Sequence, residues 1–274
     1  MHPAANTLRA FCLRVLECGD LESKLAPAPP ALHDTAPGPP VLVLRPNRDA
    51  ELSLASGAAR LPRPTELGAP EARARCLARF AHHELMAVEL FAWALLRWPD
   101  LPPDMRRDFQ RILADEQRHC RLYLERLADH GDTLADHARS DYFWRHAPAI
   151  AASPFGPRAF LCAMGLTLEQ ANLDFSALYR DAFRAAGDEA SARVCARVHD
   201  DEVRHVALAA AWLRRLTHDR SDVESYAEAV PFPFSAARAK GRRFDAEARR
   251  RAGLSEAFIE TVRAARSSPR REQR

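Results

Sequence analysis

Beyond residue 70, apolar side chains recur every three or four positions, which is the spacing of one face of an α-helix. Trp98-Pro99, Gly131 and Gly187 interrupt this pattern and are expected to end helices. The pattern predicts four long helices, at 71–98, 104–130, 158–186 and 188–217. The connection inside each pair is short, so each pair should form an antiparallel hairpin, whereas the connection at 131–157 is long.

The flanking segments have a different pattern. Leu8–Glu17 is a short amphipathic stretch, and the proline-rich sequence that follows, between residues 20 and 70, excludes long helices and predicts an extended arm. VLVL at 41–44 is its one short β-like run. After the fourth long helix PFPFS breaks the chain, and the sequence predicts two further short helices at 235–251 and 255–267.

These patterns together predict an all-α fold. A long connection between two helical hairpins is the central crossover that a ferritin-like four-helix bundle requires. The predicted parts are a helix and proline-rich arm at 1–70, the ferritin-like bundle at 71–218, and a basic extension that packs on the bundle at 219–274.

Composition limits the class of protein. Apolar residues make up 47% of the chain and charged residues 28%, which favours a globular protein over a disordered one. Apolar runs stay well short of the roughly 18 residues needed to span a bilayer, so no membrane partner is expected. The N-terminus lacks the apolar core of a secretory signal, which predicts a cytoplasmic location.

The six cysteines are scattered and form no CxxC pair, so they are interpreted as reduced, buried thiols rather than zinc ligands. The basic residues gather in the tail, because residues 236–274 hold twelve Arg or Lys and five Asp or Glu. RNA is one partner that such a tail could bind, but a solvated arginine-rich helix is the favoured interpretation.

Two copies of Glu-x-x-His carry the candidate chemistry. Glu116 and His119 lie in the second predicted helix, and Glu202 and His205 lie in the fourth. Residues three apart on a helix lie within about 60° of one another, so both side chains can reach one metal ion. Each pair shares a face with apolar residues, and buried carboxylates and imidazoles need something cationic between them, either metal ions or arginines.

The first and third helices each add one inward glutamate. Glu84 precedes Glu116 by 32 residues, and Glu169 precedes Glu202 by 33, which indicates an internal repeat. A glutamate on one helix and Glu-x-x-His on the next, present twice, is the ligand set of di-iron and di-manganese carboxylate bundles. Four carboxylates and two imidazoles favour two Fe ions, with Mn or a mixed Fe/Mn pair as the alternative, over Zn.

Five further residues are assigned to positions around the ligands. Glu89 and Asp174 lie five residues beyond Glu84 and Glu169, about 140° around the helix, so they are expected in a supporting or interface role. If Glu89 were the ligand instead of Glu84, the repeat would be misleading. The other candidates for contacts around the ligands are Tyr123, His83 and His199.

Four segments carry a resemblance: HHELMAVELFAWALLRWPDLP, DEQRHCRLYLERL, GLTLEQANLDF and DDEVRHVALAAAWL. They resemble the helices of the bacterial domain-of-unknown-function family 455 in the ferritin-like superfamily, and the chain more distantly resembles the diiron tRNA hydroxylase. The resemblance implies that Glu116 and Glu202 bridge two metal ions, that His119 and His205 each hold one, and that Glu84 and Glu169 are terminal ligands.

The leading hypothesis from the sequence is an O2-activating oxidoreductase. Its substrate would be a small molecule or a modified nucleotide, and its electron donor and oligomeric state are left open by the sequence. One alternative is an iron-handling ferroxidase, against which the long terminal segments argue, because a storage cage needs its outer surfaces for assembly. The other is a helical interaction module without catalysis.

Overall fold

The computed structural model of the chain describes residues 6–55 and 60–266. Every regular element within these residues is a helix, and the β-type contacts of Thr7 with His33 and of Ala55 with Ser140 are isolated bridges. VLVL at 41–44 belongs to no strand of this described part. The predicted all-α fold is therefore confirmed.

Contacts divide the chain into two compact units. The first comprises the residues up to Ala151 together with Ala182–Val194, and the second comprises Ala152–Asp181 and the residues from Cys195 onward. The division into three parts at 1–70, 71–218 and 219–274 is inferred from the sequence pattern alone and stays a prediction.

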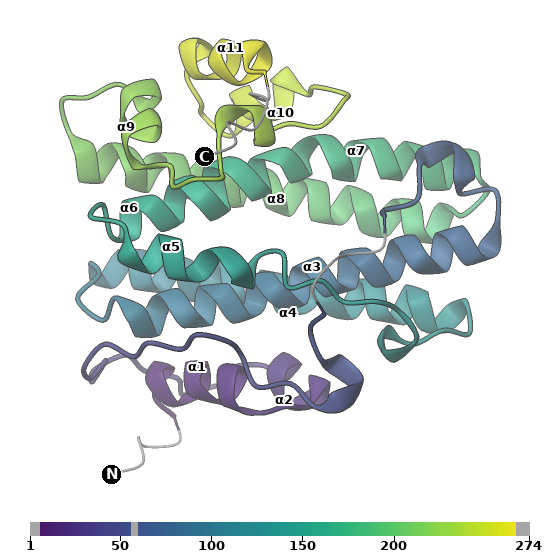
Figure 1. Cartoon of the computed structure of the whole chain (residues 1–274), viewed down its shortest axis with the longest axis horizontal. Coiled ribbons are helices and arrows are strands. Elements are labelled where there is room, and N and C mark those ends of the chain that lie inside the picture. The colour runs from purple at the N-terminus through teal and green to yellow at the C-terminus, as the bar shows by residue number, and fades with distance from the viewer. Residues whose placement is uncertain (1–5, 56–59, 267–274) are drawn as a thin grey trace, which may run out of the picture. The chain divides into compact units, whose positions relative to one another are not determined.

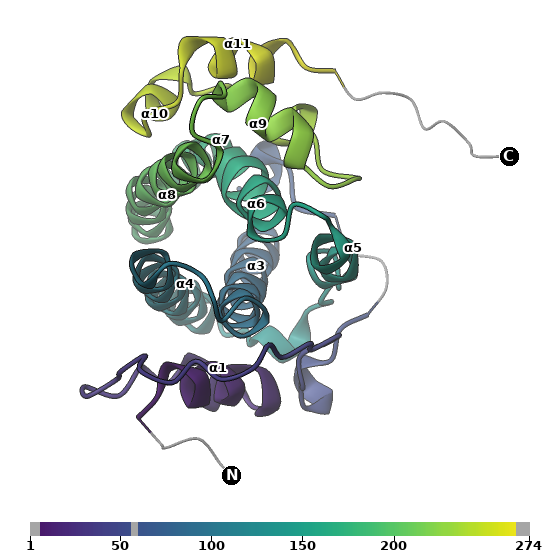
Figure 2. The same cartoon turned by 90° about the vertical axis from the view of Figure 1, so that its left-hand side faces the viewer.

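The first unit is built on an antiparallel hairpin of two long helices, α3 (Pro70–Arg97) and α4 (Pro103–Asp129), which lie side by side in Figures 1 and 2. Proline at the first position of each helix fixes a helical φ where no backbone N–H is needed. Gly131 lies just beyond α4 with a φ of +78°, the left-handed conformation that glycine adopts most easily. Both helices match their predicted spans to within one residue.

The N-terminal segment packs on this hairpin. Helix α1 (Leu8–Glu17) contacts α3 through its buried apolar face, and α2 (Leu21–Leu25) contacts α4. In its described residues, the arm that follows contains two short 3-10 helices, η1 (Ala50–Leu52) and η2 (Pro64–Glu66). Two hydrogen bonds tie it to α3, from Val41 N–H to the Leu96 carbonyl at 3.0 Å and from Trp93 Nε1 to the Val43 carbonyl at 3.1 Å.

The long connection after α4 contains short helices and packs on α3. It contains η3 (Leu134–Asp136), η4 (Trp144–His146) and α5 (Ala147–Ala152). His82 of α3 bonds through Nε2 to the carbonyl of Ser140 at 2.7 Å. A carbonyl only accepts, so His82 Nε2 carries the proton and holds this connection against α3.

The second unit contains the other long hairpin. Its first arm runs without a break through α6 (Pro157–Phe160), η5 (Leu161–Glu169) and α7 (Gln170–Ala185), and its second arm is α8 (Glu189–Thr217). Residues Ala182–Val194, which comprise the end of α7, the turn and the start of α8, belong to the first unit. Element η5 is a π-helix, which the periodicity did not predict, although the span 158–186 is helical as expected. Gly187 closes this arm with a φ of +78°.

The C-terminal part differs in detail from the prediction. A helix, α9 (Asp222–Ala229), forms where none was expected, and its start is a capping box in which Ser221 and Glu224 bond reciprocally. The helix predicted at 235–251 is instead η6 (Ala236–Arg238) and α10 (Ala246–Arg251) with irregular chain between them. The predicted last helix is confirmed as α11 (Glu256–Ala264).

The irregular stretch before α10 has a physical cause. The backbone N–H groups of Gly241 and Asp245 donate to the carboxylate of Asp174, at 2.8 and 2.7 Å. These two N–H groups bond to a side chain of α7, so they are not available for the backbone hydrogen bonds of a continuous helix.

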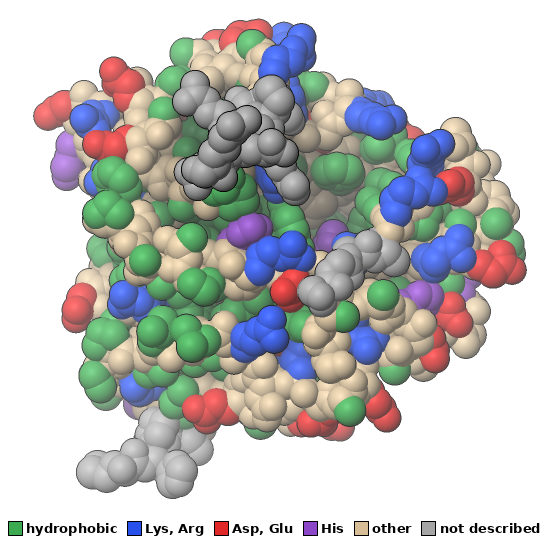
Figure 3. All heavy atoms as spheres, viewed as in Figure 1, with side chains coloured by type: hydrophobic (Ala, Val, Ile, Leu, Met, Phe, Trp, Pro, Cys, Tyr) green, Lys and Arg blue, Asp and Glu red, His purple; other side chains and the backbone are tan. Residues whose placement is uncertain are grey.

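Most of the tail arginines that the structure describes form ion pairs within the second unit. Arg250 pairs with Glu256 at 2.6 Å, and Arg251 pairs with Asp200 at 3.4 Å. Figure 3 shows Lys and Arg side chains interspersed with Asp and Glu side chains over the face drawn. No described helix combines the length and the apolar character that crossing a membrane would require.

Arg249 offers a test of how the C-terminal part is attached. Arg249→Met should lower the free energy of unfolding by about 3–5 kcal/mol, because it leaves the carboxylate of Asp174 buried without its cation. Arg251→Met removes an exposed pair and should change stability by about 1 kcal/mol or less. Urea unfolding followed by circular dichroism compares the two; equal losses would show that the buried pair does not hold this segment.

Candidate metal centre

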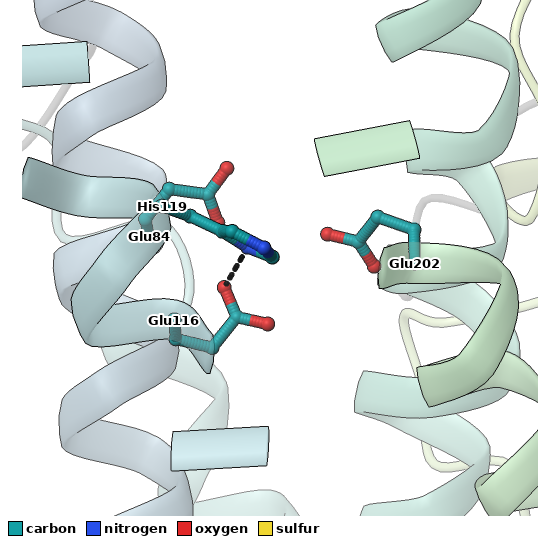
Figure 4. Close-up of side chains that lie close together, drawn as sticks. All are labelled: Glu84, Glu116, His119 and Glu202. Atoms are coloured by element: carbon teal, nitrogen blue, oxygen red, sulfur yellow. Dashed lines mark hydrogen bonds and ion pairs between the residues drawn. The ribbon is translucent and has the colours of Figure 1, made fainter. Parts of the chain in front are cut away.

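The first group of candidate ligands lies within the first unit. Glu84 of α3 and Glu116 and His119 of α4 are all buried, and each offers one ligand atom within 4.8 Å of the others. Figure 4 shows these three side chains beside one another, with the interaction between His119 Nδ1 and Glu116 Oε2 at 3.3 Å as a dashed line. The three-residue spacing of Glu-x-x-His thus places the side chains of Glu116 and His119 next to each other.

The apolar periodicity explains why this group points inward. On α3, Glu84 shares its face with Phe80 and Val88, which are 7% and 0% exposed. On α4, Phe109 and Ile112 precede Glu116 on the same face and are equally buried. Burying these apolar side chains carries the polar ones between them into the interior.

The second group has the same composition and lies within the second unit. Glu169 ends the π-helix η5, and Glu202 and His205 lie on α8. All three are buried, and each offers a ligand atom within 4.8 Å of the others. His205 Nδ1 lies 3.7 Å from Glu202 Oε2. Figure 4 also draws Glu202 on its helix.

Asn172 distinguishes the two groups. Its Nδ2 donates to Glu202 Oε1 at 2.9 Å, so one oxygen of that carboxylate has a fixed hydrogen bond. The equivalent position on α3, three residues after Glu84, is Ala87, which has no polar side chain. Asn172 follows Glu169 by three residues, which places both on one helix face, but this spacing does not predict the bond to Glu202.

Gly165 permits a close approach between η5 and α8. A Cβ atom built at this position would lie 2.3 Å from the Cβ of Ala209 and 3.8 Å from Glu169 Oε2. Only glycine avoids the first contact, so the two backbones lie close beside the Glu169 carboxylate.

Negative charge is concentrated around the first group. Burial raises the pKa of the Cys120 thiol, and the carboxylates of Glu84 and Glu116 raise it further. The thiol donates to the carbonyl of Ala81 at 3.3 Å and stays protonated. Cys120 therefore acts as a small apolar residue here and not as a metal ligand.

Glu89 lies outside both groups, because other side chains engage its carboxylate. Arg48 bonds to both of its oxygens at 3.0 and 2.8 Å, Lys24 pairs with it at 3.0 Å, and Trp144 Nε1 donates at 2.8 Å. Burial alone would raise the pKa of Glu89, but Arg48 and Lys24 outweigh it and lower the pKa. Glu89 thus joins the arm, α3 and the long connection.

Asp174 has the corresponding role in the second unit. Arg249 bonds to both of its oxygens at 2.7 and 3.0 Å, and both side chains are completely buried. Together with the backbone donors of Gly241 and Asp245, this arrangement makes Asp174 the attachment point for the C-terminal segment.

The remaining candidates also lie outside the two groups. Tyr123 is buried, with its ring centroid 5.3 Å from that of Phe80. His83 is partly exposed and stacks on Phe143 at 5.4 Å. His199 Nδ1 lies 3.1 Å from Ser176 Oγ, and burial lowers the pKa of this histidine.

The two groups have a donor set that fits a metal of the Fe or Mn class. Each offers two carboxylates and one imidazole in a buried place, and no thiolate takes part. Carboxylates crowded in the interior repel one another, and a divalent cation between them removes that cost.

Gly165→Ala tests the close approach beside Glu169. The added Cβ must push η5 away from α8, so we expect the free energy of unfolding to fall by about 1–3 kcal/mol. Gly68→Ala is the matched control, because its Cβ would meet nothing within 4 Å. Thermal unfolding of both variants checks this; equal stability of the two would contradict the tight packing.

Comparison with known proteins identifies the family. Residues 16–260 match the profile of a family described as "Protein of unknown function (DUF455)". Searches of curated proteins and of solved structures return no match. Because the matched region covers most of the chain, the protein belongs to the DUF455 family.

Proposed function

We propose that the chain is a ferritin-like carboxylate protein in which the two ligand groups come together to hold two Fe ions, or Mn or a mixed Fe/Mn pair, and that it is an O2-activating oxidoreductase. The observation that carries this proposal is the repetition of one buried donor set, two glutamates and one histidine, in both units. A single set is often a buried polar cluster, whereas two equivalent sets are the pattern of a two-metal carboxylate site.

The residues have distinct tasks in this proposal. Glu84, Glu116 and His119 would hold one metal ion, and Glu169, Glu202 and His205 the other, with Glu116 and Glu202 as the shared carboxylates. Two reduced iron ions in such a site would supply electrons to O2. Asn172 holds one oxygen of Glu202 and so limits the positions that this carboxylate can adopt.

The surroundings support a shielded reaction site. Apolar side chains flank the ligands on α3 and α4, and Tyr123 is 2% exposed one turn beyond His119. A site with little access to bulk water protects a reactive oxidant from side reactions. The substrate class proposed is a small molecule or a modified nucleotide, with an external electron donor.

The iron-handling alternative is less well supported. Helix α1 covers α3 in the first unit, and α9 contacts η5 in the second. Segments packed in this way occupy helix faces that a storage cage would use for assembly. The non-catalytic interaction module does not account for two matched sets of buried ligands, whose retention costs stability without a cation.

Iron titration separates these functions. Anaerobic Fe(II) should saturate the protein at about two ions per chain, as the six ligands of a two-metal site imply. Admission of air should then produce an iron-dependent absorbance change. Uptake that continues far beyond two ions in air would indicate storage, and no uptake at all would overturn the metal proposal.

Paired substitutions test the choice between Glu84 and Glu89. Glu84→Ala should weaken metal binding or lose one ion, because it removes a charged donor. Glu89→Ala should keep close to two ions but destabilise the fold by about 3–5 kcal/mol, since Lys24 and Arg48 lose their buried counter-charge. Metal analysis and urea unfolding of both variants give the answer; loss of metal in the Glu89 variant alone would show that the repeat has been misinterpreted.

A further inference from the structure

The most deeply buried basic side chains of the described residues are matched by acids. Lys24 and Arg48 both pair with Glu89, and Arg249 pairs with Asp174. Arg106 is 4% exposed and pairs with Asp34 at 2.5 Å. These pairs follow the physical rule that a charge removed from water needs an opposite charge and hydrogen bonds.

Arg79 of α3 departs from this rule. Its side chain is half-buried and its Nη1 atom is buried, yet Nη1 has no hydrogen-bond partner within residues 6–55 and 60–266. Burial lowers the pKa of this guanidinium, and no acid among those described opposes that effect. The terminal nitrogen is thus shielded from water without a described acceptor.

The neighbourhood of Arg79 carries further positive charge. Burial lowers the pKa of His82 to about 3, and Arg48, Arg79 and Arg139 lower it as well, so each of these guanidiniums lies near His82. The charge of Arg48 is matched by Glu89, whereas Arg139 donates to backbone carbonyls, including those of Leu134 and Ala135. The positive potential at this part of α3 is therefore incompletely neutralised by described acids.

His83 lies beside Arg79 on the helix. The two are four residues apart, which places them on one face about one turn from each other. Both are partly exposed, and the His83 ring is held by its stacking on Phe143, with an interplanar angle of 26°. The exposed part of each side chain is therefore open to a ligand at the surface.

We propose that Arg79 and His83 form a binding subsite for the oxyanion group, a carboxylate or a phosphate, of a small organic ligand. The oxyanion accepts hydrogen bonds from the exposed part of the guanidinium, whose charge is delocalised over its three nitrogens, and it supplies the acid partner that the described residues do not. Arginine suits this task because its planar N–H groups match the oxygens of carboxylate and phosphate. Binding of the anion stands independently of the metal centre, whereas its identity as part of an oxidised substrate rests on the proposed function.

Calorimetric titration of the full-length protein with benzoate and with inorganic phosphate tests the subsite. At constant ionic strength at least one of the two should saturate one site per chain, and which one does so distinguishes a carboxylate ligand from a phosphate ligand. Arg79→Gln should weaken that binding by about tenfold or more, the effect of losing a charged hydrogen-bond donor. Arg111→Gln, at an exposed arginine paired with Asp108, is the matched control and should bind as the wild type does.

Stability gives a second readout on the same variants. In buffer without oxyanions, Arg79→Gln should unfold at the same temperature as the wild type or higher, because it removes a half-buried charge that has no acid partner among the described residues. Failure of this variant to fold would overturn the proposal, since it would show that the guanidinium is already paired. Two other results would also overturn it: saturation by neither anion, or equal affinity in the Arg79→Gln variant, as expected if the anion bound a metal ion. The metal content of each variant is measured in parallel, so that a failure of the anion subsite can be distinguished from a failure of the proposed metal centre.

Discussion

The positions of the buried carboxylates determine how the rest of this chain is attached. Glu89 and Asp174 each lie in the middle of a long helix, and each is too buried to be stable without a positive charge. Lys24 and Arg48 from the N-terminal segment supply it for Glu89, and Arg249 from the C-terminal segment supplies it for Asp174. The two terminal segments, which differ completely in sequence, therefore attach to their helices by the same physical device.

The carboxylates of the two ligand groups are also buried, so the same need for positive charge applies to them. Glu84 and Glu169 stand five residues before the two attachment points, on a different face of their helices. Their carboxylates are gathered with those of Glu-x-x-His. One acid on each helix thus secures a segment of the chain, and the other is placed where divalent cations can balance it.

Much of this arrangement follows from short-range rules that a sequence displays. The hairpins come from helical periodicity and from Gly131 and Gly187, and the inward position of Glu116 and His119 comes from spacing alone. Partners distant in sequence could not be predicted in this way, because nothing local links Lys24 to Glu89 or Arg249 to Asp174. The close approach of Gly165, in the π-helix η5, to α8 is likewise a tertiary contact that local sequence does not display.

Magnetic coupling between bound ions tests the proposal that the two ligand groups form one centre for two metal ions. The protein would be loaded with Mn(II) to full occupancy and its electron paramagnetic resonance spectrum recorded at low temperature. Two ions bridged by carboxylates should give a coupled, multi-line spectrum with little signal from isolated ions. A spectrum of isolated Mn(II) alone at full occupancy would contradict the account, because it would show that the groups bind metal separately.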